Sequence, residues 1–217
     1  MAPHVWYAGY GSNLSRHRFE RYLHGGIPAG GFRRYRGATD RTLPTSDRPF
    51  RLPYQLRFGG ASRTWGGGMA FVDVRAPGWA LARLYRISAA QFADVHAQEN
   101  AGLADPADLS GIVRGQSVHA GRGNYPLITC CGDVEGEPIL LFTTQQLPTP
   151  AAPRPPYLRA ISAGLAEAHG LRSSDIVTYL RATPEVAPVY DVAALSAIVR
   201  KGVAAAMVPP PRHSSPS

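Results

Sequence analysis

The stretch that decides the fold is VWYAGYGSNL, residues 5–14. Its apolar first part, residues 5–10, predicts a buried strand, and residues 15–24 predict a short helix that ends at Gly25-Gly26. A Gly-Ser-Asn turn therefore joins strand to helix. Small residues let backbone N–H groups approach a ligand, and a turn entering a helix N-terminus attracts anions. The turn predicts a cradle for a carboxylate or phosphate; the alternative is an ordinary turn with Ser or Asn as the N-cap.

The rest of the chain predicts strands first and helices mostly later. Further strands are predicted at 69–74, 79–87, 125–131 and 138–143, and further helices at 88–99, 156–169, 174–181 and 192–203. The segment 28–58 is rich in Arg, Pro, Gly and Asp and predicts mostly loop, with short strands around 32–35 and 54–58. This order favours an α+β fold over a doubly wound sheet.

Length and composition favour one globular domain. The 217 residues are 44% hydrophobic and 18% charged, which is enough for an ordinary core. We expect one domain over residues 1–207 and a disordered Pro- and Ser-rich tail at 208–217. No apolar run reaches the ~18–20 residues of a membrane helix, and no signal peptide is recognised. The adjacent Cys130 and Cys131 point to opposite faces of a strand, which favours a reduced, cytoplasmic protein.

The formal net charge of +8 comes mostly from arginine. Such an excess permits an acidic or nucleic-acid partner. The arginines are scattered, however, and no basic run is interleaved with aromatic residues. We therefore expect a basic protein without a nucleic-acid partner.

The helix predicted at 88–99 contains the strongest candidate for a catalytic group. Ser88 and Gln91 have the spacing of a capping box, and Phe92, Val95 and Glu99 share one helix face. Glu99 thus ends an apolar stripe at the helix C-terminus. Burial and the negative end of the helix dipole both disfavour a charged carboxylate there, which suits general acid–base chemistry. The alternative is a glutamate at a frayed helix end that turns to water.

The sequence lacks the motifs of nucleotide binding, serine-hydrolase chemistry and metal binding. The sequence has no P-loop, no third glycine for a dinucleotide fingerprint and no G-x-S-x-G elbow around Ser12. The seven histidines show neither HExxH nor a Cys/His ligand spacing, and Cys130 lies in an apolar strand typical of a core position. We expect neither a metal nor a cofactor.

Five motifs in order, over roughly residues 5–171, resemble the gamma-glutamylcyclotransferase family, the AIG2-like or butirosin-type cyclotransferase fold. They comprise Tyr7 with Tyr10–Leu14; Trp65, Gly67, Gly68 and Ala70; Gln98-Glu99; Gly123-Asn124-Tyr125; and Pro155-Pro156-Tyr157 with Ile161 and Gly170-Leu171. The resemblance implies a small α+β domain with a mixed sheet or partly closed β-barrel and packed helices.

The resemblance also implies a reaction and a site. The α-amine of a gamma-glutamyl compound would attack its own γ-carbonyl, release 5-oxoproline and expel an amine or amino acid, with no cofactor. Glu99 would be the general acid and base. The substrate-binding residues would be Tyr10, Gly11, Ser12, Asn13, Leu14 and Tyr125. The partner is then a small-molecule gamma-glutamyl substrate; the oligomeric state is not predicted.

Some features depart from the family pattern. Gly9 replaces the usual alanine, and the segments 28–57 and 102–122 are longer than in small members and are expected to border the pocket mouth. Arg63 and the arginines at 33–51 would favour an acidic or larger leaving group, or they are solvated surface. Two alternatives stay open: a tailoring enzyme that removes a gamma-glutamyl group from a secondary metabolite, and a non-catalytic carboxylate-binding regulatory module.

Overall fold

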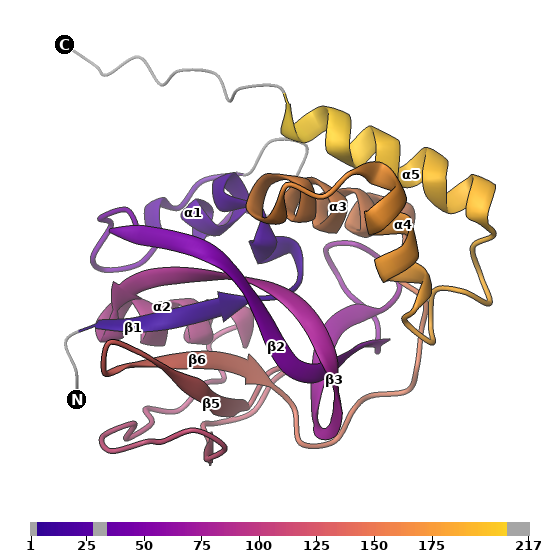
Figure 1. The fold of residues 1–217 in the computed structure, drawn as a ribbon. Helices are drawn as coiled ribbons and strands as arrows, with labels where there is room; N and C mark the ends of the chain where they lie inside the picture. The colour runs from indigo at the N-terminus through magenta and orange to yellow at the C-terminus, as the bar shows by residue number, and fades with distance from the viewer. Residues whose placement is uncertain (1–3, 28–33, 208–217) are drawn as a thin grey trace, which may run out of the picture.

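A six-stranded mixed sheet forms the centre of the computed structural model, which describes residues 4–27 and 34–207 (Figure 1). The strand order is β2-β3-β1-β6-β5-β4. The strands are β1 (His4–Gly9), β2 (Ser46–Gly59), β3 (Met69–Ser88), β4 (Ser117–His119), β5 (Leu127–Val134) and β6 (Glu137–Thr143). β1 pairs antiparallel with β3 and parallel with β6, which makes the sheet mixed. The predicted α+β class with a mixed sheet is confirmed, and the sheet stays open, with β2 and β4 at its edges.

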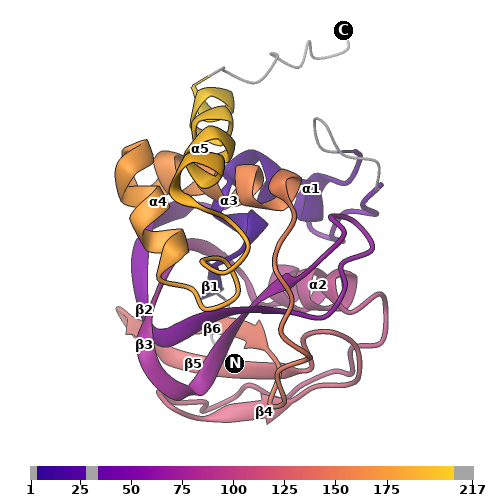
Figure 2. The same ribbon diagram turned by 90° about the vertical axis from the view of Figure 1, so that its right-hand side faces the viewer.

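Helices cover both faces of the sheet. They are α1 (Arg16–His24), α2 (Ala89–Glu99), α3 (Pro155–His169), α4 (Ser173–Arg181) and α5 (Val192–Ala206), with a 3-10 turn η1 (Ser12–Leu14). Trp6 and Ala8 of β1 face the core under α3–α5, while Val5 and Tyr7 face the core that α1 and α2 close (Figures 1 and 2). The predicted helix positions are confirmed to within a few residues.

The prediction of mostly loop over 28–58 was wrong. β2 is a 14-residue strand that pairs along β3, and β3 joins the two strands predicted at 69–74 and 79–87 into one. Pro49 and Pro53 misled the prediction, because proline interrupts an inner strand but is tolerated at the edge of a sheet. The register of the pair shifts near Tyr54, opposite Pro77. Of the strand predicted around 32–35, residues 32 and 33 lie outside the described residues, and Tyr35 forms an isolated bridge with Gly26.

Two long connections complete the framework of the site. Residues 102–122 are irregular, as predicted, apart from the short β4. The segment after β6 runs past the end of the sheet to α3 (Figure 2) and pairs Pro150 with Gly59 and Pro153 with Gly67. The tail predicted at 208–217 lies outside the described residues. No helix in the described part of the chain has both the length and the apolarity needed to cross a membrane.

The two cysteines point to opposite faces of β5, as predicted. Cys131 packs in the core under α3–α5 and Cys130 in the core under α2, and both are free thiols. Burial raises the pKa of the Cys131 thiol to about 12 and also raises the pKa of Cys130. Because the thiolate is the reactive form, both thiols should be inert in the folded protein.

Thiol labelling tests this placement. At pH 8 the native protein should react slowly with a maleimide, whereas two thiols per chain should react at once in denaturant. Mass spectrometry counts the adducts. Rapid stoichiometric labelling of the native protein would contradict the burial of β5.

Candidate active site

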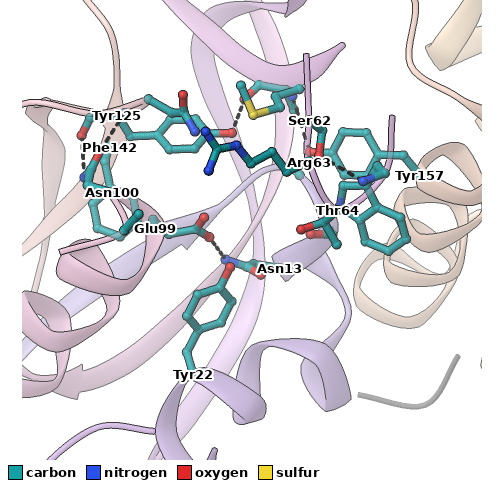
Figure 3. Close-up of a pocket in the computed structure, with 18 of the residues that line it drawn as sticks. Asn13, Tyr22, Ser62, Arg63, Thr64, Glu99, Asn100, Tyr125, Phe142 and Tyr157 are labelled. Atoms are coloured by element: carbon teal, nitrogen blue, oxygen red, sulfur yellow. Dashed lines mark hydrogen bonds between the residues drawn. The ribbon is translucent and has the colours of Figure 1, made fainter. Parts of the chain in front are cut away.

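A cavity of about 890 Å³ opens beyond the end of β1. Its walls come from the turn after β1, from α1, from the turn at 61–65, from the end of α2 and from the segment 123–125 (Figure 3). Six of the seven predicted site residues line it: Tyr10, Gly11, Ser12, Asn13, Glu99 and Tyr125. The fold therefore brings together two of the predicted site residues, Asn13 and Glu99, which are 86 positions apart in the chain.

Asn13 holds the Glu99 carboxylate in place. Its Nδ2 donates to Oε1 of Glu99 at 3.0 Å and to the hydroxyl oxygen of Tyr7 at 3.0 Å, so both amide hydrogens are used (Figure 3). Asn13 is 5% exposed and belongs to η1, which begins directly after Gly11. A Cβ at Gly9 would lie 3.0 Å from Cβ of Asn13, so β1 and the Asn13 side chain are in close contact.

The start and the end of α2 are both fixed, which positions Glu99 as its last residue. The predicted capping box is present, with reciprocal Ser88 and Gln91 hydrogen bonds at 3.0 and 3.1 Å. At the other end, Asn100 donates through Nδ2 to the Tyr125 carbonyl at 3.2 Å and accepts the Tyr125 N–H at 2.8 Å. The helix end and the 123–125 segment therefore form one rigid wall, and Glu99 is half-buried within it.

Tyr10 and Tyr125 line the cavity but do not orient Glu99. The Tyr10 hydroxyl donates to the Phe142 carbonyl at 2.6 Å, and the Tyr125 hydroxyl donates to the Ala70 carbonyl at 3.2 Å. Orientation comes from Asn13 instead, and Tyr22 of α1 reaches the same carboxylate. Burial, followed by the nearby Glu99 charge, raises the pKa of Tyr22 and Tyr7 well above the ordinary value. These phenols therefore stay protonated and can act only as neutral hydrogen-bond groups.

Tyr157 is a site residue that the sequence analysis used only as a fold motif. Its hydroxyl accepts the Ala70 N–H at 3.3 Å, and its ring stacks on Trp65 with centroids 5.2 Å apart. Burial raises the pKa of Tyr157, while hydrogen bonds from the backbones of Ala70 and Ser12 lower it. Because backbone N–H groups occupy the oxygen, the phenolic hydrogen remains available for a ligand. A Cβ at Gly11 would lie 2.8 Å from this hydroxyl, which explains the glycine.

Leu14 does not lie where the sequence analysis expected it, and the arginines at 33–51 follow the surface alternative given for them. Leu14 is fully buried in the core and does not line the cavity. Of the described arginines in 33–51, none lines the cavity; Arg48 lies over Trp6 and Arg51 over Trp79 on the sheet, and Arg33 is outside the described residues. From the described parts of the two long segments, only Tyr35 and Leu103 reach the cavity wall.

Two other arginines line the cavity: Arg63, for which the sequence analysis left a pocket role and solvated surface open, and Arg18, which it did not single out. Arg18 is 8% exposed, with its guanidinium 4.4 Å from the Trp65 ring centroid. Its helix position was predicted, but its approach to Trp65 depends on the tertiary packing of α1 against the 61–65 turn. Within residues 4–27 and 34–207, no group of three or more His, Cys, Asp or Glu could hold a metal ion.

Two histidines, His96, which is buried, and His169, which is half-buried, should make the stability of the protein pH-dependent. Burial lowers the pKa of His96, whose Nε2 lies 2.9 Å from the Tyr125 carbonyl, and lowers the pKa of His169, which faces the Ala82 carbonyl at 2.9 Å. Below the ordinary value of 6.5 the unfolded chain binds protons that the folded chain resists. The free energy of unfolding should therefore hold above pH 6.5 and fall as the pH drops below it.

Urea unfolding at pH 7.5, 6.5 and 5.5 measures this trend. The double variant His96→Gln, His169→Gln serves as the control, and its stability should depend less on pH over the same range. An equal slope in the variant and the wild type would contradict the assignment.

Comparisons with known proteins bear on the fold. No family model matches the sequence. Among solved structures, a gamma-glutamyl cyclotransferase superposes with a TM-score of 0.50 at 19% identity, over 91% of this chain and 99% of that one. An uncharacterised protein from Homo sapiens superposes with a TM-score of 0.50 at 21% identity, over 92% of this chain and 99% of that one. At 19% and 21% sequence identity, these two matches show a shared fold and nothing about activity or substrate.

One curated relative is similar in sequence. It is named histone deacetylase 5, from Arabidopsis thaliana, and is 30% identical over 201 residues. The match covers 81% of this chain but only 30% of the relative, so most of that protein lies outside the region of similarity.

Proposed function

We propose that this chain, which has the gamma-glutamyl cyclotransferase-like fold, is an enzyme that releases 5-oxoproline from a gamma-glutamyl amino acid or amine. The observation that supports it most strongly is the Glu99 carboxylate, held by the Asn13 amide at 3.0 Å in the wall of a large cavity. The groups that hold this carboxylate, the Asn13 amide and the Tyr22 hydroxyl, are neutral, and none of the described residues forms an ion pair with it. That arrangement suits a group that must accept a proton and return it.

The proposed reaction needs proton transfers and a folded substrate. Glu99 takes a proton from the substrate's α-ammonium, and the freed amine attacks the γ-carbonyl. The new C–N bond closes a five-membered ring, and Glu99 returns its proton to the leaving nitrogen as the old amide C–N bond breaks. The ring nitrogen also gives up its second proton, which passes through Glu99 to the expelled amine, so the products are the neutral lactam and an ammonium. Holding the substrate in this geometry can supply about 7–11 kcal/mol of the barrier reduction in favourable intramolecular reactions.

The turn after β1 would hold the substrate's α-carboxylate. Gly11, Ser12 and Asn13 line the cavity, and the backbone N–H groups of Gly11 and Asn13 would bind the carboxylate. The Ser12 backbone is bonded to the Tyr157 hydroxyl, whose own hydrogen would be a further donor beside them. Ser12 and Asn13 are the first residues of the 3-10 turn, where N–H groups lack helical partners. A small anion at this end would place the α-amine on the side of Glu99.

The size of the cavity also supports a second candidate function, the removal of a gamma-glutamyl group from a larger metabolite. A volume of about 890 Å³ is near the upper end of ordinary small-molecule pockets, about 300–1,000 Å³. A gamma-glutamyl group alone would not fill it. The reaction is unchanged in this candidate, and only the leaving group is larger.

The test is 5-oxoproline release, followed by mass spectrometry, from a panel of gamma-glutamyl amino acids, simple amines and larger amines. N-acetylated versions of the same compounds are the matched control, because their blocked nitrogen cannot attack. We expect release from at least one free-amine compound and none from its acetylated twin. Binding of the panel without release of 5-oxoproline from any member would overturn the proposal and favour a non-catalytic binding module.

A further inference from the structure

Tyr85 of β3 holds the main chain of the turn that bears Asn13. Its hydroxyl donates to the Asn13 carbonyl oxygen at 2.7 Å. The Tyr85 side chain is fully buried and does not line the cavity. Burial raises the pKa of Tyr85 well above the ordinary value, so the phenol stays protonated and remains a hydrogen-bond donor. Tyr85 therefore acts on the turn and has no contact with a ligand in the cavity.

The Tyr85 hydroxyl is itself held in a fixed position. The Tyr85 ring stacks on the Phe19 ring of α1 with centroids 4.0 Å apart, and the Arg83 guanidinium lies 5.5 Å from the Tyr85 centroid. A phenylalanine could make these ring contacts equally well. The tyrosine adds one hydrogen bond, and that bond goes to the residue whose side chain holds Glu99. Because a buried hydroxyl without a partner costs free energy, the turn is favoured in the position that supplies one.

Arg83 of the same strand holds the next carbonyl group of the turn. Its side chain is buried, and its Nη1 donates to the Leu14 carbonyl oxygen at 3.4 Å. The guanidinium also pairs with Asp47 of β2 and with Glu167 of α3, each at 2.6 Å. Charge-assisted hydrogen bonds of this kind are stronger than neutral ones, so the arginine is a firm support. Strands β2 and β3 and helix α3 thus fix the turn together.

Asn13 is bound at both ends. Its carbonyl oxygen accepts from Tyr85, and its Nδ2 donates to Glu99 and to the Tyr7 hydroxyl. Only two rotatable bonds separate the backbone of an asparagine from its amide. Because Asn13 is buried among closely packed neighbours, its side chain has little room to compensate for a displaced backbone. A shift of the turn is therefore passed on to the Glu99 carboxylate.

We propose that Tyr85 is a positioning residue, which fixes the Asn13 backbone so that the Asn13 amide orients Glu99. The inference rests on the proposed function and concerns a residue that does not touch the substrate. Tyr85→Phe removes one oxygen atom and keeps the ring. It should lower kcat by about 10-fold to 100-fold, because a misplacement of about 1 Å can cost about 10²-fold in rate. It should change KM less than kcat.

Tyr179→Phe is the matched control. Tyr179 is also buried, and its hydroxyl accepts the Leu81 N–H at 3.0 Å, a bond that connects α4 to β3 and does not involve the turn. Both variants should lower the melting temperature by a similar amount. Only Tyr85→Phe should lower kcat for the panel compound that the wild type turns over fastest. An equal kcat for the two variants would overturn the inference, since it would assign Tyr85 a purely structural role.

A double-variant cycle tests the route through Asn13. In an Asn13→Ala background the amide is gone, so Tyr85→Phe should have little further effect on kcat. The same fall in kcat in both backgrounds would show that Tyr85 acts independently of the Asn13 amide, and it would contradict the inference.

A measurement on the free protein separates this inference from the proposed function. In ¹⁵N-labelled protein the side-chain NH₂ group of Asn13, identified by its loss in Asn13→Ala, should exchange slowly with solvent because both its hydrogens are bonded. Exchange should be faster in Tyr85→Phe and unchanged in Tyr179→Phe. This result would support the role of Tyr85 even if no 5-oxoproline is formed. Unchanged exchange in Tyr85→Phe would overturn that role even if the wild type is an active cyclotransferase.

Discussion

Glu99→Gln should lower kcat by about 10²-fold to 10⁴-fold, the range in which general acid–base groups contribute, while the protein remains folded. Glutamine keeps an oxygen that can accept from Asn13 Nδ2, so the hydrogen bond at 3.0 Å can persist. What glutamine cannot do is take a proton from the substrate's ammonium. Release of 5-oxoproline measures the activity, and thermal unfolding checks the fold.

Two further variants separate chemistry from structure. Glu135→Gln, in the turn between β5 and β6, removes a carboxylate remote from the cavity and should leave both kcat and the melting temperature unchanged. Asn13→Ala leaves the carboxylate but removes its anchor, and we expect a smaller fall in kcat than in Glu99→Gln. Near wild-type turnover by folded Glu99→Gln would assign the proton transfers to another group.

Gly164→Ala should be the most destabilising small substitution in α3. A Cβ at Gly164 would lie 2.4 Å from Cβ of Leu14 and 2.5 Å from the Ser15 backbone nitrogen. Alanine favours a helix by up to about 1 kcal/mol over glycine. The contacts outweigh this gain, because backbone atoms cannot move aside as a flexible side chain can. We expect a net loss of about 3 kcal/mol, at the upper end of ordinary overpacking.

The same substitution should also lower activity, because the atoms it displaces belong to the turn that bears Ser12 and Asn13. Urea unfolding gives the stability change and 5-oxoproline release gives the activity of the folded fraction. Ala163→Ser adds one atom at the neighbouring half-buried position of the same helix and serves as the control. Wild-type stability of Gly164→Ala would mean that α3 does not approach the turn as closely as described.

The parts of the site that follow from local patterns could be predicted from the sequence. Glu99 was recognised because Phe92 and Val95 mark the buried face of its helix, and the Gly-Ser-Asn turn because it interrupts an apolar strand. Both signals are contained within about one helix or one turn. Their direct contact through the Asn13 amide depends on the packing of β1 against α2, which no local pattern specifies.

The remaining site residues needed the tertiary structure. Arg18 and Tyr22 occupy ordinary helix positions, and only the docking of α1 turns them toward the cavity. Trp65 and Tyr157 were quoted as motif positions, yet their stacking joins segments that are far apart in the chain. β2 was missed for a related reason, since an edge strand tolerates prolines that argue against an inner strand.

Product analysis in H₂¹⁸O tests the central claim, cyclisation by the substrate's own amine, most directly. Wild-type protein is incubated with gamma-glutamyl-alanine in labelled water, with a sample lacking enzyme as control, and the products are analysed by mass spectrometry. We predict unlabelled 5-oxoproline and free alanine, because no water enters the bond that forms. Glutamate that contains one ¹⁸O atom, formed in place of 5-oxoproline, would contradict the account and assign the cavity to hydrolysis.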